Sequence, residues 1–359
     1  MKTSVNYIIV GQGLAGTILA QTLIKSGKSI IIINDCKSSS ASMVAAGLYN
    51  PVVFKRLVKS WKADELISFM DKFYVDSETL LGEHFYFKKQ IVKLFSEEQE
   101  KVLWLKKSKE DVGRYLSKTI QNNFLKDLIH YNSAGESSEV IDAGNLNTSL
   151  FLNSFENYFK INKQHIDEIF EYDKLTFTDH SVNYKNINAD KLIFCEGYKT
   201  IHNPYFNWLP FKLTKGELLT IKIPMPLEDE LSFADKVINK GVFVLPLGNN
   251  FFKVGATYEW TDLSENTTAA GKNFLIEKLD KIFKVPYEIV IQQAGIRPTV
   301  LDRRPLIGMH KHFPSLGIFN GMGTKGVMLA PFFANQFADF LENKTVLDKE
   351  VDIARFSNN

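Results

Sequence analysis

The sequence is poor in cysteine and has almost no excess charge. Only Cys36 and Cys195 occur among its 359 residues, and neither has a second cysteine or a cluster of histidines at metal-ligand spacing. The 43 Lys and Arg nearly balance the 41 Asp and Glu, which leaves a formal net charge of +2. These shortages argue against a disulfide framework, a metal centre and a nucleic-acid partner, since the last needs a basic surface.

Long apolar runs are absent as well. The first one, Tyr7–Val10, ends at Gly11, whereas a secretory signal needs roughly seven to fifteen apolar residues. No window approaches the roughly 18 apolar residues of a membrane-spanning helix. We therefore expect a cytoplasmic protein without a membrane partner.

The chain opens with the pattern of a βαβ unit. A strand is predicted over 7–10, a helix over 15–26 and a second strand over 29–33, where the run of isoleucines at 30–33 favours burial on both faces. The turn between strand and helix reads Gly11-Gln12-Gly13-Leu14-Ala15-Gly16, which is GxGxxG. In this context it predicts a dinucleotide site, in which the glycines allow a tight turn, close approach of a pyrophosphate, and close helix packing.

A side chain that binds the ribose is expected after the second strand of such a unit. Asn34 stands at the usual spacing, and Asp35 carries the carboxylate. The sequence leaves the choice between them open.

The rest of the chain mixes two kinds of pattern. Helical patterns cover 61–128, interrupted by a strand-like stretch at 85–95, and recur at 145–158, 269–282 and 327–343. Alternation predicts antiparallel strands over 166–188 and 211–258, and buried strands are predicted at 191–195 and 316–319. The fold class is therefore α/β (α+β overall), with a Rossmann-type FAD-binding domain (1–84, 140–210 and 291–359) interwoven with an antiparallel-sheet substrate domain (85–139 and 211–290).

FAD is favoured over NAD by the later segments. The strand 189–195 closes on Gly197, as expected for a second strand beside the dinucleotide. A second GxGxxG occurs at 321–326, but no buried strand follows in 344–359 to complete a βαβ unit. We expect this helix start to face the flavin ring, where its N–H groups would stabilise negative charge on the reduced ring.

Several motifs in order along the chain carry a family resemblance. They are the fingerprint at 11–16, the small-residue loop 42–48, Thr214-Lys215-Gly216-Glu217, Leu245-Pro246 followed by Lys253-Val254-Gly255-Ala256-Thr257, Gly295-Ile296-Arg297-Pro298, Asp302 with 304–308, and 326–331. Together they resemble the D-amino-acid oxidase superfamily of FAD-dependent oxidoreductases, and in particular its glycine-oxidase-like members.

The resemblance implies non-covalent FAD and a set of contacts to it. The expected cofactor-binding residues are Gly11, Gly13, Leu14, Ala15, Gly16, Asn34, Asp35, Ser42, Ala45, Ala46, Gly47, Leu48, Ile166, Gly197, Gly323, Thr324, Lys325, Gly326, Val327 and Met328.

The resemblance also implies that Arg297 binds a substrate carboxylate, with Lys325, Tyr49 and Tyr258 as further candidates near the substrate. Three positions depart from the glycine oxidase pattern. Phe243 stands where a tyrosine is usual, Leu247 stands where an arginine is usual, and a second arginine near the C-terminal flavin loop is replaced around Thr324-Lys325.

The implied activity is oxidation of a C–N bond of a small amine or amino acid by hydride transfer to flavin N5, with dioxygen or a small carrier as electron acceptor and no obligatory protein base. Two alternatives remain at this point: flavin-dependent oxidation of a modified tRNA nucleoside, or a non-catalytic FAD-binding protein. Substrate identity and oligomeric state are left open.

Overall fold

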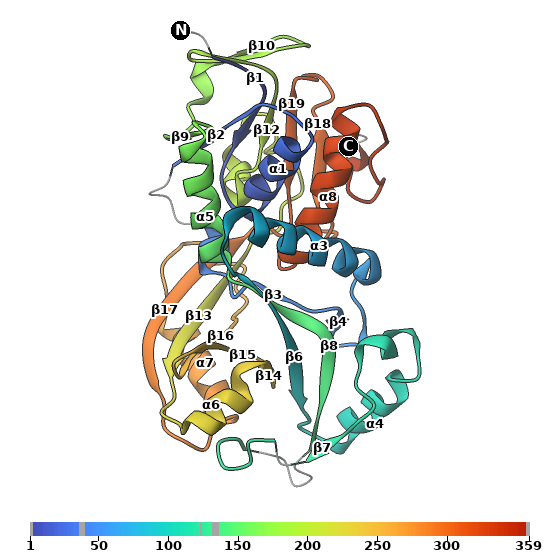
Figure 1. The fold of residues 1–359 in the computed structure, drawn as a ribbon, viewed down its shortest axis with the longest axis vertical. Helices are drawn as coiled ribbons and strands as arrows, with labels where there is room; N and C mark the ends of the chain where they lie inside the picture. The colour runs from blue at the N-terminus through green and yellow to red at the C-terminus, as the bar shows by residue number, and fades with distance from the viewer. Residues whose placement is uncertain (1–2, 36–39, 123, 131–135, 357–359) are drawn as a thin grey trace.

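The fold consists of two sheets that lie one above the other (Figure 1). The computed structural model describes residues 3–35, 40–122, 124–130 and 136–356; Cys36 lies outside these ranges. The first sheet has eight strands: β1 (Thr3–Val10), β2 (Ile30–Asn34), β9 (His165–Asp167), β10 (Leu175–Phe177), β11 (Val182–Tyr184), β12 (Ile187–Phe194), β18 (Leu306–Met309) and β19 (Leu316–Asn320).

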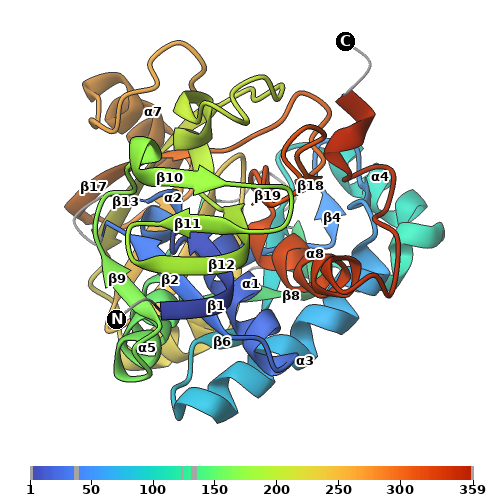
Figure 2. The same ribbon diagram turned by 90° about the horizontal axis from the view of Figure 1, so that it is seen from above.

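The centre of the first sheet is parallel. In the order β9, β2, β1, β12, β19 every neighbouring pair is parallel, and β10, β11 and β18 add antiparallel edges. Figure 2 shows β10, β11, β12 and β1 following one another in this order. Alternate isoleucines of β2 enter two different apolar clusters, which explains why the strand is apolar throughout its length.

Four long helices contribute most of the helical residues of one large apolar cluster that they share with this sheet. They are α1 (Leu14–Lys25), α3 (Ala63–Leu81), α5 (Thr148–Ile161) and α8 (Gly326–Leu341), and α1 packs directly against α8. Both α1 and α8 begin immediately after a strand of the parallel core, β1 and β19 respectively. Their N-termini therefore lie at the carboxyl ends of two parallel strands that have β12 between them, at the edge of the sheet where α/β folds bind ligands.

The second sheet has nine strands and forms the lower half of Figure 1. Its main order is β17 (Glu288–Arg297), β13 (Thr214–Lys222), β16 (Phe251–Gly255), β15 (Phe243–Gly248), β14 (Lys236–Asn239), β6 (Tyr86–Leu94), β8 (Glu136–Leu146) and β3 (Leu48–Tyr49), with β7 (Gln121–Asn122) beside β8. All neighbours are antiparallel except β14 and β6.

Shorter elements complete the described chain. They are α2 (Ala41–Val44), α4 (Glu98–Lys107), α6 (Leu227–Ala234), α7 (Ala269–Asp280), the hairpin of β4 (Val52–Val53) and β5 (Val58–Lys59), and four 3-10 turns at Asp111–Tyr115, Tyr172–Lys174, Gly197–His202 and Ile353–Phe356. Within the ranges described above, no helix combines the length and apolar character that a membrane crossing requires.

The α/β class with a Rossmann-type unit is confirmed. The segment 211–258, predicted as strands, also contains the helix α6. The region 166–188 is not wholly antiparallel, because α5 returns the chain to the edge of the parallel core and β9 pairs there in parallel with β2. The expected domain boundaries at 139/140 and 290/291 cut through β8 and β17, both of which belong to the second sheet. The chain therefore leaves the second sheet after β8 and after β17, not within them.

Candidate flavin and substrate site

Two of the three glycines of the N-terminal turn, Gly11 and Gly16, pack where no side chain could fit. Gly11 has φ +99°, and a Cβ there would lie 2.6 Å from the carbonyl oxygen of Cys195. A Cβ on Gly16 would lie 1.9 Å from the carbonyl oxygen of Gly11. Gly13 is different, since its Cβ would face open space with only the Ser42 Oγ within 4 Å, at 3.6 Å. The turn is therefore tightly packed at Gly11 and Gly16, whereas Gly13 faces a cavity.

Asn34 helps to hold this turn. Its Oδ1 accepts a hydrogen bond of 2.9 Å from the backbone N–H of Gln12. Both Asn34 and Asp35 line the cavity. The structure therefore adds a role for Asn34, fixing the loop, that the spacing alone did not reveal.

The cavity has a volume of about 890 Å³ and runs between the two sheets. This is near the upper end of the roughly 300–1,000 Å³ of ligand pockets. Twenty of the predicted site residues line it: Gly11, Gly13, Leu14, Ala15, Asn34, Asp35, Ser42, Ala45, Ala46, Gly47, Leu48, Gly197, Tyr258, Arg297, Gly323, Thr324, Lys325, Gly326, Val327 and Met328.

Three predicted residues do not line the cavity. Gly16 packs under the turn, and Ile166 pairs with Ile33 inside the sheet. Tyr49 is 2% exposed, its ring stacks on Tyr86 at 5.4 Å, and burial raises the pKa of its hydroxyl. All three contribute to packing next to the site.

The carbonyl groups at the end of α2 and the start of the loop 44–48 accept side-chain hydrogen bonds from β16 and α5. Lys253 Nζ donates to the carbonyl oxygens of Val44 (3.1 Å) and Ala45 (3.4 Å), and Thr148 Oγ1 also donates to Ala45. Burial lowers the pKa of the Lys253 ammonium. Sequence reasoning did not single out Lys253, because a lysine that alternates with apolar residues on a strand suggests an exposed face.

The second glycine-rich turn ends at the N-terminus of α8. Lys325 occupies the N-cap position and no side chain caps the helix. Its Nζ donates to Ser60 Oγ, and burial lowers the pKa of this ammonium to about 8. The uncapped N–H groups and the positive end of the helix dipole favour negative charge at this point of the cavity.

Arg297 lies at the end of β17 with its guanidinium in the cavity wall. The Cζ atom is 4.7 Å from the centroid of the Tyr258 ring. Nη1 donates long hydrogen bonds of 3.4 Å to the carbonyl oxygens of Lys215 and Thr257, and burial lowers the pKa of the side chain. Among the described residues no carboxylate forms an ion pair with it.

Gly216 makes room for this guanidinium. A Cβ on Gly216 would lie 1.9 Å from Nη2 of Arg297. The positive charge thus lies part-buried between a glycine backbone and an aromatic ring, and within the described part of the chain its acceptors are carbonyl oxygens. Such a site is suited to a planar anionic ligand, because a guanidinium can bind a carboxylate with two parallel hydrogen bonds.

The sequence model described as FAD dependent oxidoreductase matches residues 6–340, which is most of the chain. The chain therefore belongs to this family. The D-amino-acid oxidase resemblance seen in the motifs is confirmed.

Individual relatives are distant. Glycine oxidase from Geobacillus kaustophilus (strain HTA426) is 29% identical over 147 residues, which is 40% of this chain and 37% of that protein. The bifunctional protein ThiO/ThiG from Nostoc sp. (strain PCC 7120 / SAG 25.82 / UTEX 2576) is 28% identical over 135 residues, 37% of this chain and 20% of that protein. The matched segments thus span well under half of these curated relatives.

Solved structures match over nearly the full length. The crystal structure of glycine oxidase from Geobacillus kaustophilus has a TM-score of 0.76 at 19% identity, covering 99% of this chain and 98% of that one. L-proline dehydrogenase from P. horikoshii has a TM-score of 0.79 at 14% identity, covering 100% and 99%. At these identities the similarity establishes the fold.

The geometry fits FAD, the cofactor of this oxidoreductase family. The pyrophosphate needs a glycine turn and N–H groups at a helix start. Gly13 is the N-cap residue of α1 and makes no side-chain cap, and the Leu14 N–H donates to Ser42 Oγ at 3.2 Å. From there the cavity continues along the loop 44–48 to the N-terminus of α8. This FAD-dependent oxidoreductase therefore has a continuous site from the nucleotide end to Arg297.

Proposed function

We propose that this chain oxidises a C–N bond of a small amine or amino acid that carries a carboxylate. The observation that carries the proposal is the part-buried Arg297 guanidinium, which lines the same cavity as the flavin loops and has no protein carboxylate as partner among the described residues. A cation that is partly removed from water without a counter-ion is costly. A bound carboxylate would compensate for that cost.

The surroundings of Arg297 suit a small, partly apolar molecule. Leu218, Val242 and Phe243 also line the cavity, while Leu247, at the position where an arginine was expected, is half exposed and outside it. Carboxylate recognition in this proposal therefore depends on Arg297, with Lys325 as a second cation. Among the described residues, the carboxylates of the lining are Asp35, Glu168 and Glu196, which follow strands β2, β9 and β12 of the first sheet, whereas Arg297 ends β17 of the second. In this proposal the substrate amine therefore binds uncharged.

When bound, FAD supplies the two-electron acceptor for a hydride from the carbon next to nitrogen. The protein residues would orient the substrate and exclude water, in line with the modest demands of flavin chemistry on a protein base. We propose that FAD is held non-covalently by the first sheet and that the second sheet covers the substrate. Dioxygen or a small carrier would then reoxidise the flavin.

Turnover on a panel of amines and amino acids tests this function. Purified protein should be yellow, with flavin released by heat or acid, and at least one carboxylated amine should be consumed. Hydrogen peroxide as product would identify dioxygen as the acceptor, whereas turnover only with an added dye would indicate a carrier. Protein that cannot take up FAD, or that consumes no member of the panel with either acceptor, would contradict the proposal.

A further inference from the structure

A long connection after β16 carries Tyr258 over Arg297. It runs from Ala256 to Thr268 and joins β16 to α7. Tyr258 is 56% exposed, yet its ring covers the guanidinium and lines the cavity. An exposed side chain keeps one position only if its backbone is held, so the attachments of this connection matter for the site.

The first attachment is backbone pairing with β13. Lys215 and Glu259 exchange two hydrogen bonds, of 2.8 and 3.0 Å. The backbone N–H of Glu217 donates to Thr257 Oγ1 at 2.8 Å, and the N–H of Thr257 donates back to the Glu217 carbonyl oxygen at 3.2 Å. Tyr258 therefore stands between two residues that are both paired with the same strand.

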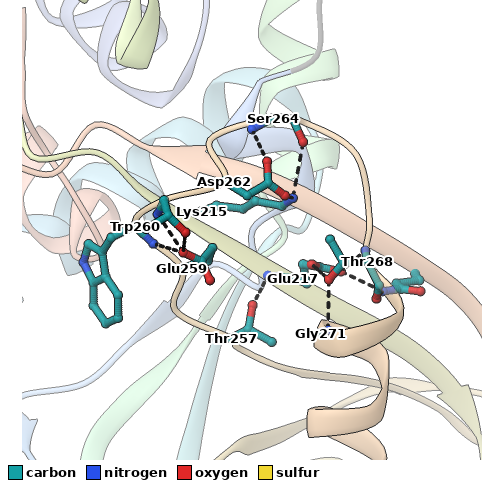
Figure 3. Close-up of polar contacts among 11 residues, drawn as sticks. Lys215, Glu217, Thr257, Glu259, Trp260, Asp262, Ser264, Thr268 and Gly271 are labelled. Carbon is teal, nitrogen blue, oxygen red and sulfur yellow. Dashed lines mark hydrogen bonds and ion pairs between the residues drawn. The ribbon is translucent and has the colours of Figure 1, made fainter.

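The second attachment is an ion pair beneath the middle of the connection. Lys215, whose side chain is fully buried, places its Nζ 2.5 Å from Asp262 Oδ2 and 3.5 Å from Ser264 Oγ (Figure 3). The Lys215 ammonium is the main cause that lowers the pKa of Asp262 to about 2. Asp262 thus stays ionised in the neutral range, and it is the carboxylate partner of the buried Lys215 among the described residues, so breaking the pair would be costly.

The third attachment closes the connection at the start of α7. The Glu217 carboxylate accepts 2.9 and 2.7 Å hydrogen bonds from the backbone N–H and the Oγ1 of Thr268, the N-cap residue of α7 (Figure 3). Gln292 Nε2 donates to the same carboxylate at 2.6 Å. A Cβ on Gly271 would lie 2.6 Å from the Glu217 Cδ, so this glycine leaves the space that the carboxylate fills.

All three attachments converge on Lys215-Gly216-Glu217. Because side chains alternate along a strand, Lys215 and Glu217 point to one face of β13 and Gly216 turns to the other, where the Arg297 guanidinium lies against it. The tripeptide 215–217 therefore contacts the Arg297 guanidinium through Gly216 and also holds the backbone on either side of Tyr258, whose ring covers the guanidinium.

We propose that Lys215 and Glu217 are positioning residues for carboxylate selection: from the far face of β13 they fix the connection 256–268, so that Tyr258 forms a rigid cover over Arg297. This inference rests on the proposed function, in which Arg297 binds the carboxylate. It assigns substrate selectivity to two buried charges that do not line the cavity themselves.

The test compares benzoate with its neutral amide, benzamide, as calorimetric ligands of the FAD-loaded protein. Asp262→Asn removes the charge that holds the connection, and benzoate affinity should fall about tenfold or more, since small misplacements of a binding group are costly. Benzamide affinity should stay at the wild-type value. Glu139→Gln is the matched control, because it breaks a similar ion pair, with Lys236 at 2.6 Å, elsewhere in the second sheet.

A second variant covers the case in which Asp262→Asn does not fold. The double variant Lys215→Met with Asp262→Leu replaces the pair by apolar side chains, which proteins often accept without loss of stability. It should show the same selective loss of benzoate. Wild-type benzoate affinity in both variants, or an equal loss of benzamide affinity, would overturn the positioning role.

The same experiment separates this inference from the proposed function. If Arg297→Gln loses benzoate while both variants of the ion pair keep it, the carboxylate site stands and the positioning role is wrong. If the wild-type protein binds benzoate no better than benzamide, the assignment of Arg297 fails, and the inference fails with it.

Discussion

The backbone of Gly11 lies directly against the carbonyl group of Cys195, so that a Cβ on residue 11 would be 2.6 Å from that oxygen. The contact joins the ends of β1 and β12, the two parallel strands at the nucleotide end of the cavity. Because φ at Gly11 is +99°, the position excludes other residues on conformational grounds as well.

Gly11→Ala should lower both stability and FAD affinity. We expect the free energy of unfolding to fall by about 2 kcal/mol or more, from backbone strain together with the clash. Gly27→Ala is the control, because Gly27 has φ +78° but nothing within 4 Å of the added Cβ. Urea unfolding and FAD titration of both variants test the account, which is wrong if the two behave alike.

Gly13→Glu should abolish FAD binding while leaving the fold intact. The Cβ position at Gly13 is open except for Ser42 Oγ at 3.6 Å, so a side chain fits the apoprotein. A glutamate there adds bulk and negative charge where the pyrophosphate is expected at the α1 N-terminus. The flavin-to-protein absorbance ratio and the circular dichroism melting curve are the measurements; a folded, fully yellow variant would disprove this location for the pyrophosphate.

Arg297→Gln should weaken carboxylate ligands by roughly 2–4 kcal/mol, the scale of a lost charge-assisted bidentate pair. Gly216→Ala should act in the same direction without removing the charge, because its Cβ would lie 1.9 Å from Arg297 Nη2. Spectral titration of the bound flavin with benzoate measures both effects. Unchanged dissociation constants would exclude Arg297 as the carboxylate site.

Lys325 should make stability depend on pH. Burial lowers the pKa of its ammonium from 10.5 to about 8, so between about pH 8 and pH 10 the unfolded chain binds more protons than the folded one. The free energy of unfolding therefore rises with pH across this window, by at most about 3 kcal/mol. Below it the ammonium is charged in both states, and its burial costs stability.

Urea unfolding of the apoprotein at several pH values checks this dependence. Lys325→Met should remove the rise and should be more stable than wild type at neutral pH. Replacing the exposed Lys106 by methionine is the control and should leave the rise unchanged. A wild-type curve that is flat or falls between about pH 8 and pH 10 relative to Lys325→Met would contradict the pKa shift.

Local patterns predicted the nucleotide end of the molecule well. Strand, glycine turn and helix at 7–26 appear as β1 and α1, because periodicity and glycine spacing are consequences of local geometry. The same holds for β19 and α8 around the second glycine turn. Loops 42–48 and 323–328, separated by most of the chain, were expected at one cavity because of the family motifs, and both line it.

Contacts between residues far apart in the sequence were harder to predict from local patterns. The alternation of apolar and polar residues around Ile166 is the same for a parallel and an antiparallel strand. The pairing of β9 with β2 depends on the position at which α5 ends, which local patterns do not give. The burial of Lys215 and its contact with Asp262, 47 positions later, likewise depend on how β13 and the connection 256–268 meet. Lysines on strands carry no local sign of such burial.

The most direct test of the account is anaerobic reduction of the bound flavin by matched pairs of compounds, each an amino or imino acid and the amine that lacks its carboxylate. The account predicts that at least one acid bleaches the flavin about thirtyfold or more faster than its amine at limiting concentration, and that Arg297→Gln removes this preference. Equal rates for acid and amine in the wild-type protein, or no bleaching by any pair, would contradict it.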